Sequence, residues 1–485
     1  MDVGLLLLIA TLNLGSISAV PGLPGQGTPT SAVILPGSGA LSHGPMDPPP
    51  APAVAAEQDG QAAPSDKKPA APPAEKEKES DKPTLPRVET WGDFDPGEGF
   101  LVARTKAGEL SISGYAMVRY VNQLPPEQTF TDHNGTEHPV DTRQDLFSHR
   151  VMVFLKGWIG NSRFIYNIFF WTVNTTDQKA IFGSFGYQFS RRFSLYAGIS
   201  GLPGTRSIQG SHPYWLAPDR VMADEFFRPY FTMTVSAVGE LTPGLWWNAT
   251  VGNNNSSLGV KATDLDRKLS YGASTWWMPT THEFGPRGAY GDWEMHDKLA
   301  TRFGIGYVYS PENRQTSATA GPSNNTTLRL ADSLNVFDTD SLAPGVTVQS
   351  VDYEDLSIDA GMKYRGIFVQ AEAYNRWLDH FVADGPLPVT RIHDWGFYIQ
   401  AAFFPIPHKL EAYAATSQIF GDKDAGFGKP NEYLAGLNYY LFNSRNYRLN
   451  LQIMDVNRSP VNSTFGYYVG GQTGTTISVA GSVFF

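Results

Sequence analysis

The last eleven residues of the chain, 475–485 (TTISVAGSVFF), alternate between two kinds of side chain. One register is apolar or small and the other is polar or small apart from Phe484: Ile477, Val479, Gly481, Val483 and Phe485 against Thr476, Ser478, Ala480 and Ser482. Successive side chains of a β-strand point to opposite faces, so this segment is predicted to be a strand with one apolar face. A strand of about ten residues with this pattern fits one span of a closed transmembrane barrel.

The same period of two recurs upstream, and with the closing strand it predicts sixteen strands. The upstream segments are 110–120, 151–156, 163–173, 180–189, 193–199, 231–241, 245–252, 269–278, 299–310, 355–364, 367–377, 395–404, 410–416, 433–441 and 448–456. Tight connections such as 191–192 and 364–366 alternate approximately with long polar ones such as 122–145 and 311–349. We therefore predict an all-β fold, a transmembrane antiparallel barrel of sixteen strands within residues 91–485.

Composition excludes other classes of protein. Hydrophobic residues make up 41% of the chain and the mean hydropathy is -0.26. Beyond residue 20 no apolar run approaches the roughly twenty residues that a membrane helix needs. The formal net charge of -10 argues against a nucleic-acid partner, which would require a basic surface. With 0 Cys the chain contains no disulfide and no thiolate metal site.

The N-terminal part differs from the rest. Residues 1–19 have an apolar core and a small-residue end, which is typical of a signal peptide, although the basic residues that usually precede the core are missing. Residues 20–90 are rich in Pro and Ala and carry a run of mixed charge. Such a segment cannot bury a core, so we predict a disordered periplasmic linker. A sharper alternative is an arm that contacts the cell wall or a partner.

Pairs of aromatic residues lie near the predicted strand ends: 169–171, 246–247, 276–277, 403–404 and 439–440. Amphipathic rings concentrate where a membrane meets water, so these pairs predict aromatic girdles around the barrel. The alternative is the core of a soluble β-sandwich. No second sheet or helix is evident that would cover the outer face.

Several basic residues fall in the register opposite to the apolar one: Arg119, Arg150, Lys156, Lys363 and Arg376. A charge on the lipid face near the membrane midplane costs about 2–4 kcal/mol, so these side chains are predicted to line water in the lumen. Cations in a wet lumen attract anions. Alternatively, they only pair with acids such as Glu372 and Glu411 across the lumen.

The segment 200–230 is too long for a turn and mixes charges of both signs. Arg206, Arg220 and Arg228 stand among three acids, Asp219, Asp224 and Glu225. Loops of this length without regular structure are usually functional or disordered. We predict that the segment folds into the barrel and narrows a pore, so that these three arginines join the pore-lining residues. A plain surface loop is the alternative.

Signals of chemistry are missing from the chain. The ten His are scattered, and G-x-S-x-G, H-E-x-x-H and phosphate-loop strings do not occur. We predict no enzymatic activity, no catalytic residues, no metal site and no cofactor. A barrel enzyme would need a Ser or Asp beside a His near one rim, which the sequence does not display.

Several segments in order resemble the phosphate-selective porin O and P family. They are 147–157 (FSHRVMVFLKG), 198–204, 219–220, 227–229, 244–253 (GLWWNATVGN), 395–411 and 432–440 (EYLAGLNYY). The resemblance implies a trimer of sixteen-stranded barrels that passes anions. It also implies that Arg150, Lys156, Arg220 and Arg228 have the pore-lining role of the family's basic residues. That family usually has basic residues at positions where this chain has His149, Met152, Ser200-Gly201 and Ala415. With fewer basic residues along the predicted lumen, the sequence does not support phosphate selectivity.

Together these features predict a porin in the outer membrane of a Gram-negative-type envelope. It would be a homotrimer surrounded by lipid that lets small hydrophilic solutes diffuse passively, with a weak preference for anions. The alternative is a structural anchor whose N-terminal arm grips the cell wall or a partner.

Overall fold

The computed structural model describes residues 99–173, 178–210, 212–255, 263–316, 323–462 and 467–485. The predicted signal peptide at 1–19 and the predicted linker at 20–90 lie outside the described residues, as do the first residues of the predicted barrel domain. No described helix is long and apolar enough to cross a membrane.

Most of the described chain is β-strand, and its helices are short. The strands are β1 (Phe100–Arg104), β2 (Gly108–Gln123), β3 (Thr129–Thr131), β4 (Glu137–Pro139), β5 (Gln144–Ile159), β6 (Asn161–Val173), β7 (Gln178–Ser190), β8 (Phe193–Gly201), β9 (Phe231–Thr242), β10 (Leu245–Gly252), β11 (Ser270–Trp277), β12 (Ala300–Asn313), β13 (Val348–Tyr364), β14 (Ile367–Ala383), β15 (Arg391–Ile406), β16 (Leu410–Phe420), β17 (Asn431–Tyr440), β18 (Tyr447–Asn457) and β19 (Gly474–Phe484). The helices are α2 (Met222–Phe227), η1 (Pro286–Gly288) and η2 (Leu441–Asn443).

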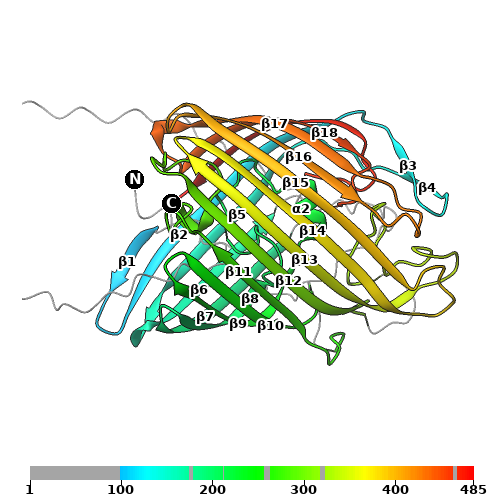
Figure 1. Cartoon of the computed structure of the whole chain (residues 1–485), viewed down its shortest axis with the longest axis horizontal. Helices are drawn as coiled ribbons and strands as arrows, with labels where there is room; N and C mark the ends of the chain where they lie inside the picture. Colours follow the sequence, from blue (N-terminus) through cyan, green and yellow to red (C-terminus); the bar gives the residue numbers. More distant parts are fainter. Residues whose placement is uncertain (1–98, 174–177, 211, 256–262, 317–322, 463–466) are drawn as a thin grey trace, which may run out of the picture. The chain divides into compact units, whose positions relative to one another are not determined.

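Sixteen of these strands close into one antiparallel barrel (Figure 1). β2 pairs with β5 on one side and with β19 on the other, and β5 to β18 each pair with the next strand along the chain. Closure leaves no unpaired edge in the ring, which is the condition for a sheet to sit in hydrocarbon. The predicted number of strands and their order are confirmed.

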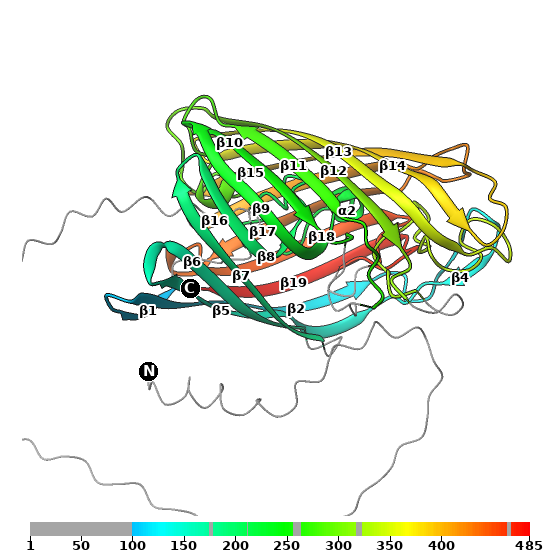
Figure 2. The ribbon, with the colours of Figure 1, turned by 90° about the horizontal axis from the view of Figure 1, so that it is seen from below.

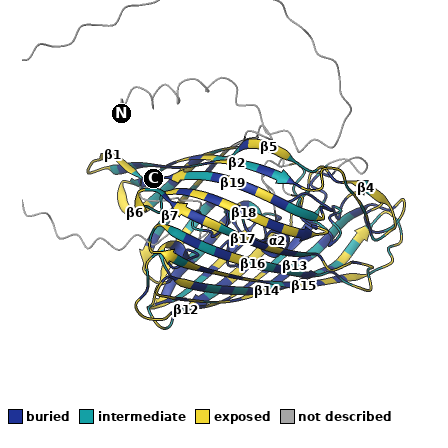
Figure 3. Cartoon of the chain, turned by 90° about the horizontal axis from the view of Figure 1, so that it is seen from above, coloured by how far each residue is buried: buried dark blue, intermediate teal, exposed yellow. Residues whose placement is uncertain are grey.

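Side chains alternate along each strand as the sequence predicts (Figure 3). In β19, Ile477 and Val479 are 37% and 49% exposed, whereas Thr476 and Ser478 between and beside them are 0% exposed. The exposed apolar side chains form a belt around the outside of the barrel: Val118, Val153, Ile168, Ile181, Val235, Val251, Ile305, Ile358, Ile399, Leu437, Leu451, Ile453 and Val479. Soluble monomers rarely expose an apolar surface of this extent, so the outer face is suited to lipid.

The aromatic pairs divide between the two faces because neighbouring residues of a strand point in opposite directions. Trp277 is 50% exposed on the outer face, but Trp276 is buried inside, where its ring stacks on Trp246 with centroids 6.1 Å apart. Likewise Tyr439 is exposed and Tyr440 is buried. The prediction of an aromatic girdle is therefore wrong for Trp276 and Tyr440, which lie inside the barrel.

One corner of the interior departs from the polar pattern. The inward residues of β2, β5, β6, β7 and β19 there form an apolar cluster: Tyr115, Met117, Met152, Phe154, Phe169, Phe182, Ala480 and Phe484. The rings of Phe154 and Phe169 lie 5.2 Å apart, and those of Phe169 and Phe182 lie 4.8 Å apart. Phe484, the exception in the terminal sequence pattern, faces inward and belongs to this cluster.

The two ends of the barrel differ in their connections. At one end, called the short-turn end, hairpins close through Gly160, residues 191–192, 243–244, 365–366, 407–409 and 441–446. The connections at the other end, the long-turn end, include 124–143, 202–230 and 314–347. The exception is the connection 278–299 between β11 and β12, which is long although it lies at the short-turn end.

β1 adds a short strand outside the ring of sixteen. It pairs with β2 from Glu109 to Ile112, whereas β19 pairs with β2 from Tyr115 to Gln123. The Phe100 ring lies 5.0 Å from that of Phe485. β1 therefore covers the part of β2 that the C-terminal strand leaves open.

The lipid-facing belt can be tested by placing a charge on β18. Replacing Leu451 in the middle of the outer face, Leu451→Arg, should lower the free energy of unfolding by about 2–4 kcal/mol. Asn457→Arg, on the same face at the end of the strand, should change it by about 0–1 kcal/mol. Urea unfolding of the chain folded into phospholipid vesicles measures both values. Equal effects of the two substitutions would contradict a lipid-facing belt.

Candidate functional site

The connection between β8 and β9, residues 202–230, is called the inner segment, and its described residues, 202–210 and 212–230, lie inside the barrel. Its helix α2 is enclosed by strands in two perpendicular views (Figures 1 and 2). All six side chains of α2 are buried, including Met222 and Phe227, which are 0% exposed. The prediction that this segment folds into the barrel is confirmed by its contacts with the barrel wall.

Wall side chains hold the backbone of the inner segment at several places. The Tyr353 hydroxyl of β13 donates to the Phe227 carbonyl at 2.6 Å. On β17, the Asn438 amide donates to the Leu216 carbonyl at 2.9 Å. Because a backbone group without water needs a partner inside the protein, these bonds allow an irregular segment to be buried in the lumen.

Asp219 of the inner segment joins two of the predicted pore-lining arginines. Its carboxylate lies 2.6 Å from the Arg119 guanidinium of β2 and 3.2 Å from that of Arg150 of β5. The Arg119 side chain is 0% exposed and that of Arg150 is 12% exposed. Both residues face inward, as predicted, and both are paired with an acid in this structure.

Arg220 and Arg228 pair with acids of α2 within the same segment. Arg228 donates to Glu225 through two nitrogens at 2.5 and 2.8 Å, and Arg220 lies 3.7 Å from Asp224. The Ser207 hydroxyl also donates to Asp224, at 2.9 Å. These pairs give the short helix a fixed geometry that six residues alone could not maintain.

Arg206 connects the inner segment to the wall formed by β12, β13 and β14. Its backbone N–H donates to Glu372 at 2.8 Å, and its guanidinium lies 4.0 Å from Asp359. Asp359 also accepts from Arg302 at 3.1 Å. All these side chains have at most 2% of their surface exposed.

The remaining predicted pore-lining residues also face the interior. Arg376 of β14 pairs with Asp394 of β15, and its guanidinium lies 4.1 Å from the centre of the Phe226 ring. Lys363 of β13 donates to the Phe284 carbonyl at 2.8 Å. Lys156 of β5 is buried, with 6% of its surface exposed. Pairing with acids thus accounts for most of these charges, and contact with a solute stays a prediction.

A concentration of positive charge surrounds His212 of the inner segment. Burial, and then the charges of nearby guanidinium groups, hold the pKa of His212 well below its usual range. Those groups come from β5, the inner segment, the 278–299 connection and β18: Arg150, Arg220, Arg287 and Arg448. Four segments distant in sequence therefore place cations around one point of the interior.

The connection 278–299, called the short-end segment, enters the barrel from the short-turn end. The Tyr290 N–H donates to the Tyr214 carbonyl at 2.9 Å, and the Arg206 guanidinium donates to the Gly288 carbonyl. The two internal segments are therefore in direct contact. Together they fill the lumen beside the walls that carry most of the buried charges.

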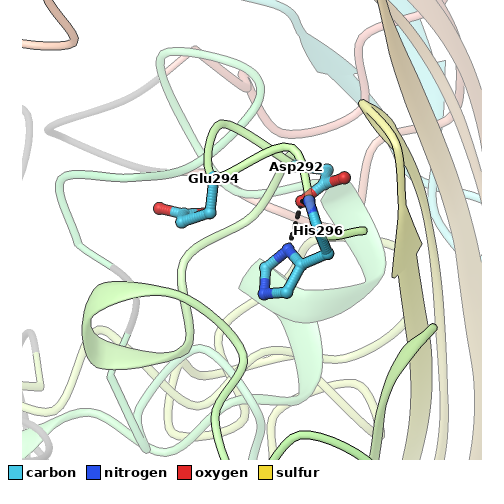
Figure 4. Close-up of side chains that lie close together, drawn as sticks. All are labelled: Asp292, Glu294 and His296. Carbon is cyan, nitrogen blue, oxygen red and sulfur yellow. Dashed lines mark hydrogen bonds and ion pairs between the residues drawn. The ribbon is translucent and has the colours of Figure 1, made fainter. Parts of the chain in front are cut away.

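An Asp–Glu–His group lies in the short-end segment (Figure 4). His296 is hydrogen-bonded to Asp292 through Nδ1 and to Glu283 through Nε2, the latter at 2.6 Å. These two bonds, the one to Asp292 first, raise the pKa of His296 to about 9. Burial alone would raise the pKa of Asp292, but hydrogen bonds from His296 and Gly366 outweigh it and lower that pKa. Asp292, Glu294 and His296 could together hold a cation.

A small cavity lies along the wall formed by β7 to β10. Its volume is about 30 Å³, and hydroxyl, amide and small apolar side chains line it: Ser184, Tyr196, Ala197, Gly198, Ile199, Ser200, Thr234, Ser236, Val238 and Asn248. That volume is enough for one or two water molecules. No charged side chain is among its lining residues.

Sequence reasoning missed part of this arrangement. The inward acids Asp359, Asp394 and Glu432 follow the same period of two that revealed the basic residues, so that pattern could have found them. The short-end segment was left as an unassigned connection between the strands predicted at 269–278 and 299–310. Its signal in the sequence is D-x-E-x-H at 292–296.

Comparisons with known proteins find similar structures but no matching family. No family model and no curated protein matches the sequence. Three of the solved structures that are similar to this chain are outer-membrane proteins. A loop L8 deletion mutant of OmpT from Vibrio cholerae has a TM-score of 0.46 and 11% identity, covering 78% of this chain and 100% of that chain. The anion-selective porin from Comamonas acidovorans has a TM-score of 0.45 and 12% identity, covering 78% of this chain and 100% of that chain.

The outer membrane channel DcaP of Acinetobacter baumannii has a TM-score of 0.43 and 10% identity, covering 80% of this chain and 100% of that chain. Solved structures similar to this chain therefore include outer-membrane porins and channels. The likeness is too low to transfer the role of any residue. The resemblance to the phosphate-selective family stays a prediction.

The role of Asp219 can be tested by removing its charge. Asp219→Asn should lower the free energy of unfolding by about 3–5 kcal/mol, because it leaves two buried guanidinium groups without their carboxylate. Asp424→Asn, in an exposed turn, should change it by less than about 0.5 kcal/mol. Urea unfolding in detergent micelles measures both. If Asp219→Asn changed the free energy of unfolding no more than Asp424→Asn does, the ion pairs of Asp219 would not be what holds the inner segment in place.

Proposed function

We propose that this chain is an outer-membrane channel through which small hydrophilic solutes diffuse passively. The observation that carries the proposal is a closed barrel with an apolar exposed exterior and a charged interior. A lipid-facing exterior places the barrel in a membrane, and spanning strands rather than helices are typical of the outer membrane. Charges that would be expensive in lipid are stable only where protein or water surrounds them.

The route for solutes runs, in this proposal, along the wall of β7 to β10. Ser184, Ser236 and Asn248 of this wall line the small cavity. Ion pairs and hydrogen bonds fix the inner segment against other strands, such as β2, β13 and β17. A porin of sixteen strands has room for an aqueous channel. The two internal segments reduce that room, so the conductance expected for this barrel is small.

A weak preference for anions is part of the same proposal. The cations around His212 include Arg150, which is paired with Asp219, and Arg220, which is paired with Asp224. The positive potential in this proposal comes from the group as a whole. The predicted pore-lining set of Arg119, Arg150, Lys156, Arg206, Arg220, Arg228, Lys363 and Arg376 keeps its inward placement in support of it. The resemblance to phosphate-selective porins adds the expectation of a homotrimer that passes anions.

The ion preference is tested by recording from the purified chain in a planar bilayer with a KCl gradient. We expect a small unit conductance and a reversal potential of the sign that anion flow produces. Arg150→Gln should shift the reversal potential toward zero, because Arg150 belongs to the cationic group around His212. Lys423→Gln, exposed in a loop at the long-turn end, is the control and should leave it unchanged. A cation-selective potential overturns the anion preference, and a barrel that never conducts overturns the channel.

A structural anchor is the second candidate, and the packed interior favours it. Leu202, Met222 and Phe227 of the inner segment are 0% exposed and belong to one apolar cluster with inward wall residues. An anchor needs no open route. Deleting residues 21–89 separates the candidates: conductance and an intact envelope after deletion support the channel, whereas a leaky envelope with no conductance in either chain supports the anchor.

A further inference from the structure

The short-end segment brings an imidazole and two carboxylates together at one end of the barrel (Figure 4). One ligand atom from each of Asp292, Glu294 and His296 lies within 4.8 Å of the other two. We propose that these three residues bind one divalent transition-metal cation of the Zn²⁺ type. This inference stands apart from the proposed channel function, since it concerns the turn end and not the solute route.

The three donors suit such a cation chemically. Zn²⁺ takes imidazole nitrogen and carboxylate oxygen at about 2.0–2.2 Å, and three protein ligands leave a fourth position for water. In a tetrahedral site the ligand atoms would lie about 3.3 Å apart, which follows from those bond lengths. Figure 4 shows Glu294 beside the hydrogen-bonded pair of Asp292 and His296. A rotation of the Glu294 side chain would therefore be needed to close the site.

Outer partners hold the ligands in an orientation suited to a metal. Glu283 accepts from Nε2 of His296 at 2.6 Å, and Nδ1 donates to Asp292. A bound metal would displace that Nδ1 proton and take Nδ1 as its nitrogen ligand. A carboxylate on the far nitrogen is the usual support of a metal-bound histidine. Glu283 is itself fixed by the Gly285 N–H at 2.6 Å, and the second oxygen of Asp292 accepts from the Gly366 N–H at 2.6 Å.

Access and charge are compatible with an ion. The Asp292 and His296 side chains are 0% and 6% exposed, whereas those of Glu294 and Glu283 are 27% and 51% exposed. A cation can therefore approach from the Glu294 side. Two cationic groups face Glu294: Lys363 at 3.5 Å and Arg445 at 3.0 Å. They compete with the metal for this carboxylate, so moderate affinity is expected.

A second group of the same composition provides the control. Asp352, Asp379 and His380, near the long-turn end of β13 and β14, also bring one imidazole and two carboxylates within the same distance. The His380 side chain is 77% exposed, and its Nδ1 contacts both acids, at 3.3 and 2.9 Å. Without a buried, oriented imidazole this group should bind a metal much more weakly.

The test is calorimetric titration of ZnCl₂ into the full chain, folded in detergent and freed of metal with EDTA. We expect one Zn²⁺ per chain. His296→Gln should weaken binding at least tenfold, and Glu283→Gln should weaken it about 10–100-fold, as for loss of an outer partner. Glu294→Gln, whose side chain is partly exposed, should weaken it without loss of the fold. His380→Gln should leave binding unchanged.

Co²⁺ in place of Zn²⁺ gives a second readout, a visible absorption band whose loss in His296→Gln would identify the imidazole as a ligand. The fold of each variant is checked by the heat-dependent mobility of the barrel in electrophoresis. No stoichiometric binding, or binding that survives both His296→Gln and Glu294→Gln, overturns the proposal. Binding lost in His380→Gln but kept in His296→Gln overturns it in favour of the other group.

Discussion

The structure depends on closure of the hydrogen-bond ladder between β19 and β2. In hydrocarbon an unpaired backbone group costs several kcal/mol, so a sheet in a membrane must have no free edge. Pairs such as Val479 with Tyr120 join the last span to the first. Once the ring is closed, each strand can present only one face to lipid. The period of two, the apolar belt and the inward placement of charge all follow from that geometry.

Closure also explains why so many charges are buried inside. The outward register admits mainly apolar residues, so the polar residues of each strand gather in a confined interior. In that confined space a guanidinium needs a carboxylate, because an unpaired charge away from water is expensive. Arg119, Arg302 and Arg376 each lie next to an acid, and the acids come from other strands or from the inner segment. The interior is therefore organised by pairing between distant parts of the chain.

This division sets what the sequence alone could predict. All sixteen strands were found because lipid selects residue types locally, one strand at a time. The inner segment was placed correctly from its length and mixed charge, but its partners were not. Asp219 meets Arg119 and Arg150 only after three further spans, β6, β7 and β8, have folded. Asp292 and His296 were not singled out because they lie in a connection between two predicted strands, where the period of two assigns no direction to a side chain.

The way the inner segment is held bears on how a route could open. A buried ion pair gains Coulomb energy but loses about as much hydration, so it adds little net stability and mainly fixes position. Burial of Leu202, Met222 and Phe227 supplies the stability, at about 1.5–3 kcal/mol for each large apolar side chain. Moving the whole segment would expose all of these together. In the proposed channel, a route would therefore open by small shifts beside the β7 to β10 wall, where neutral side chains line the cavity, and not by release of the segment as a lid.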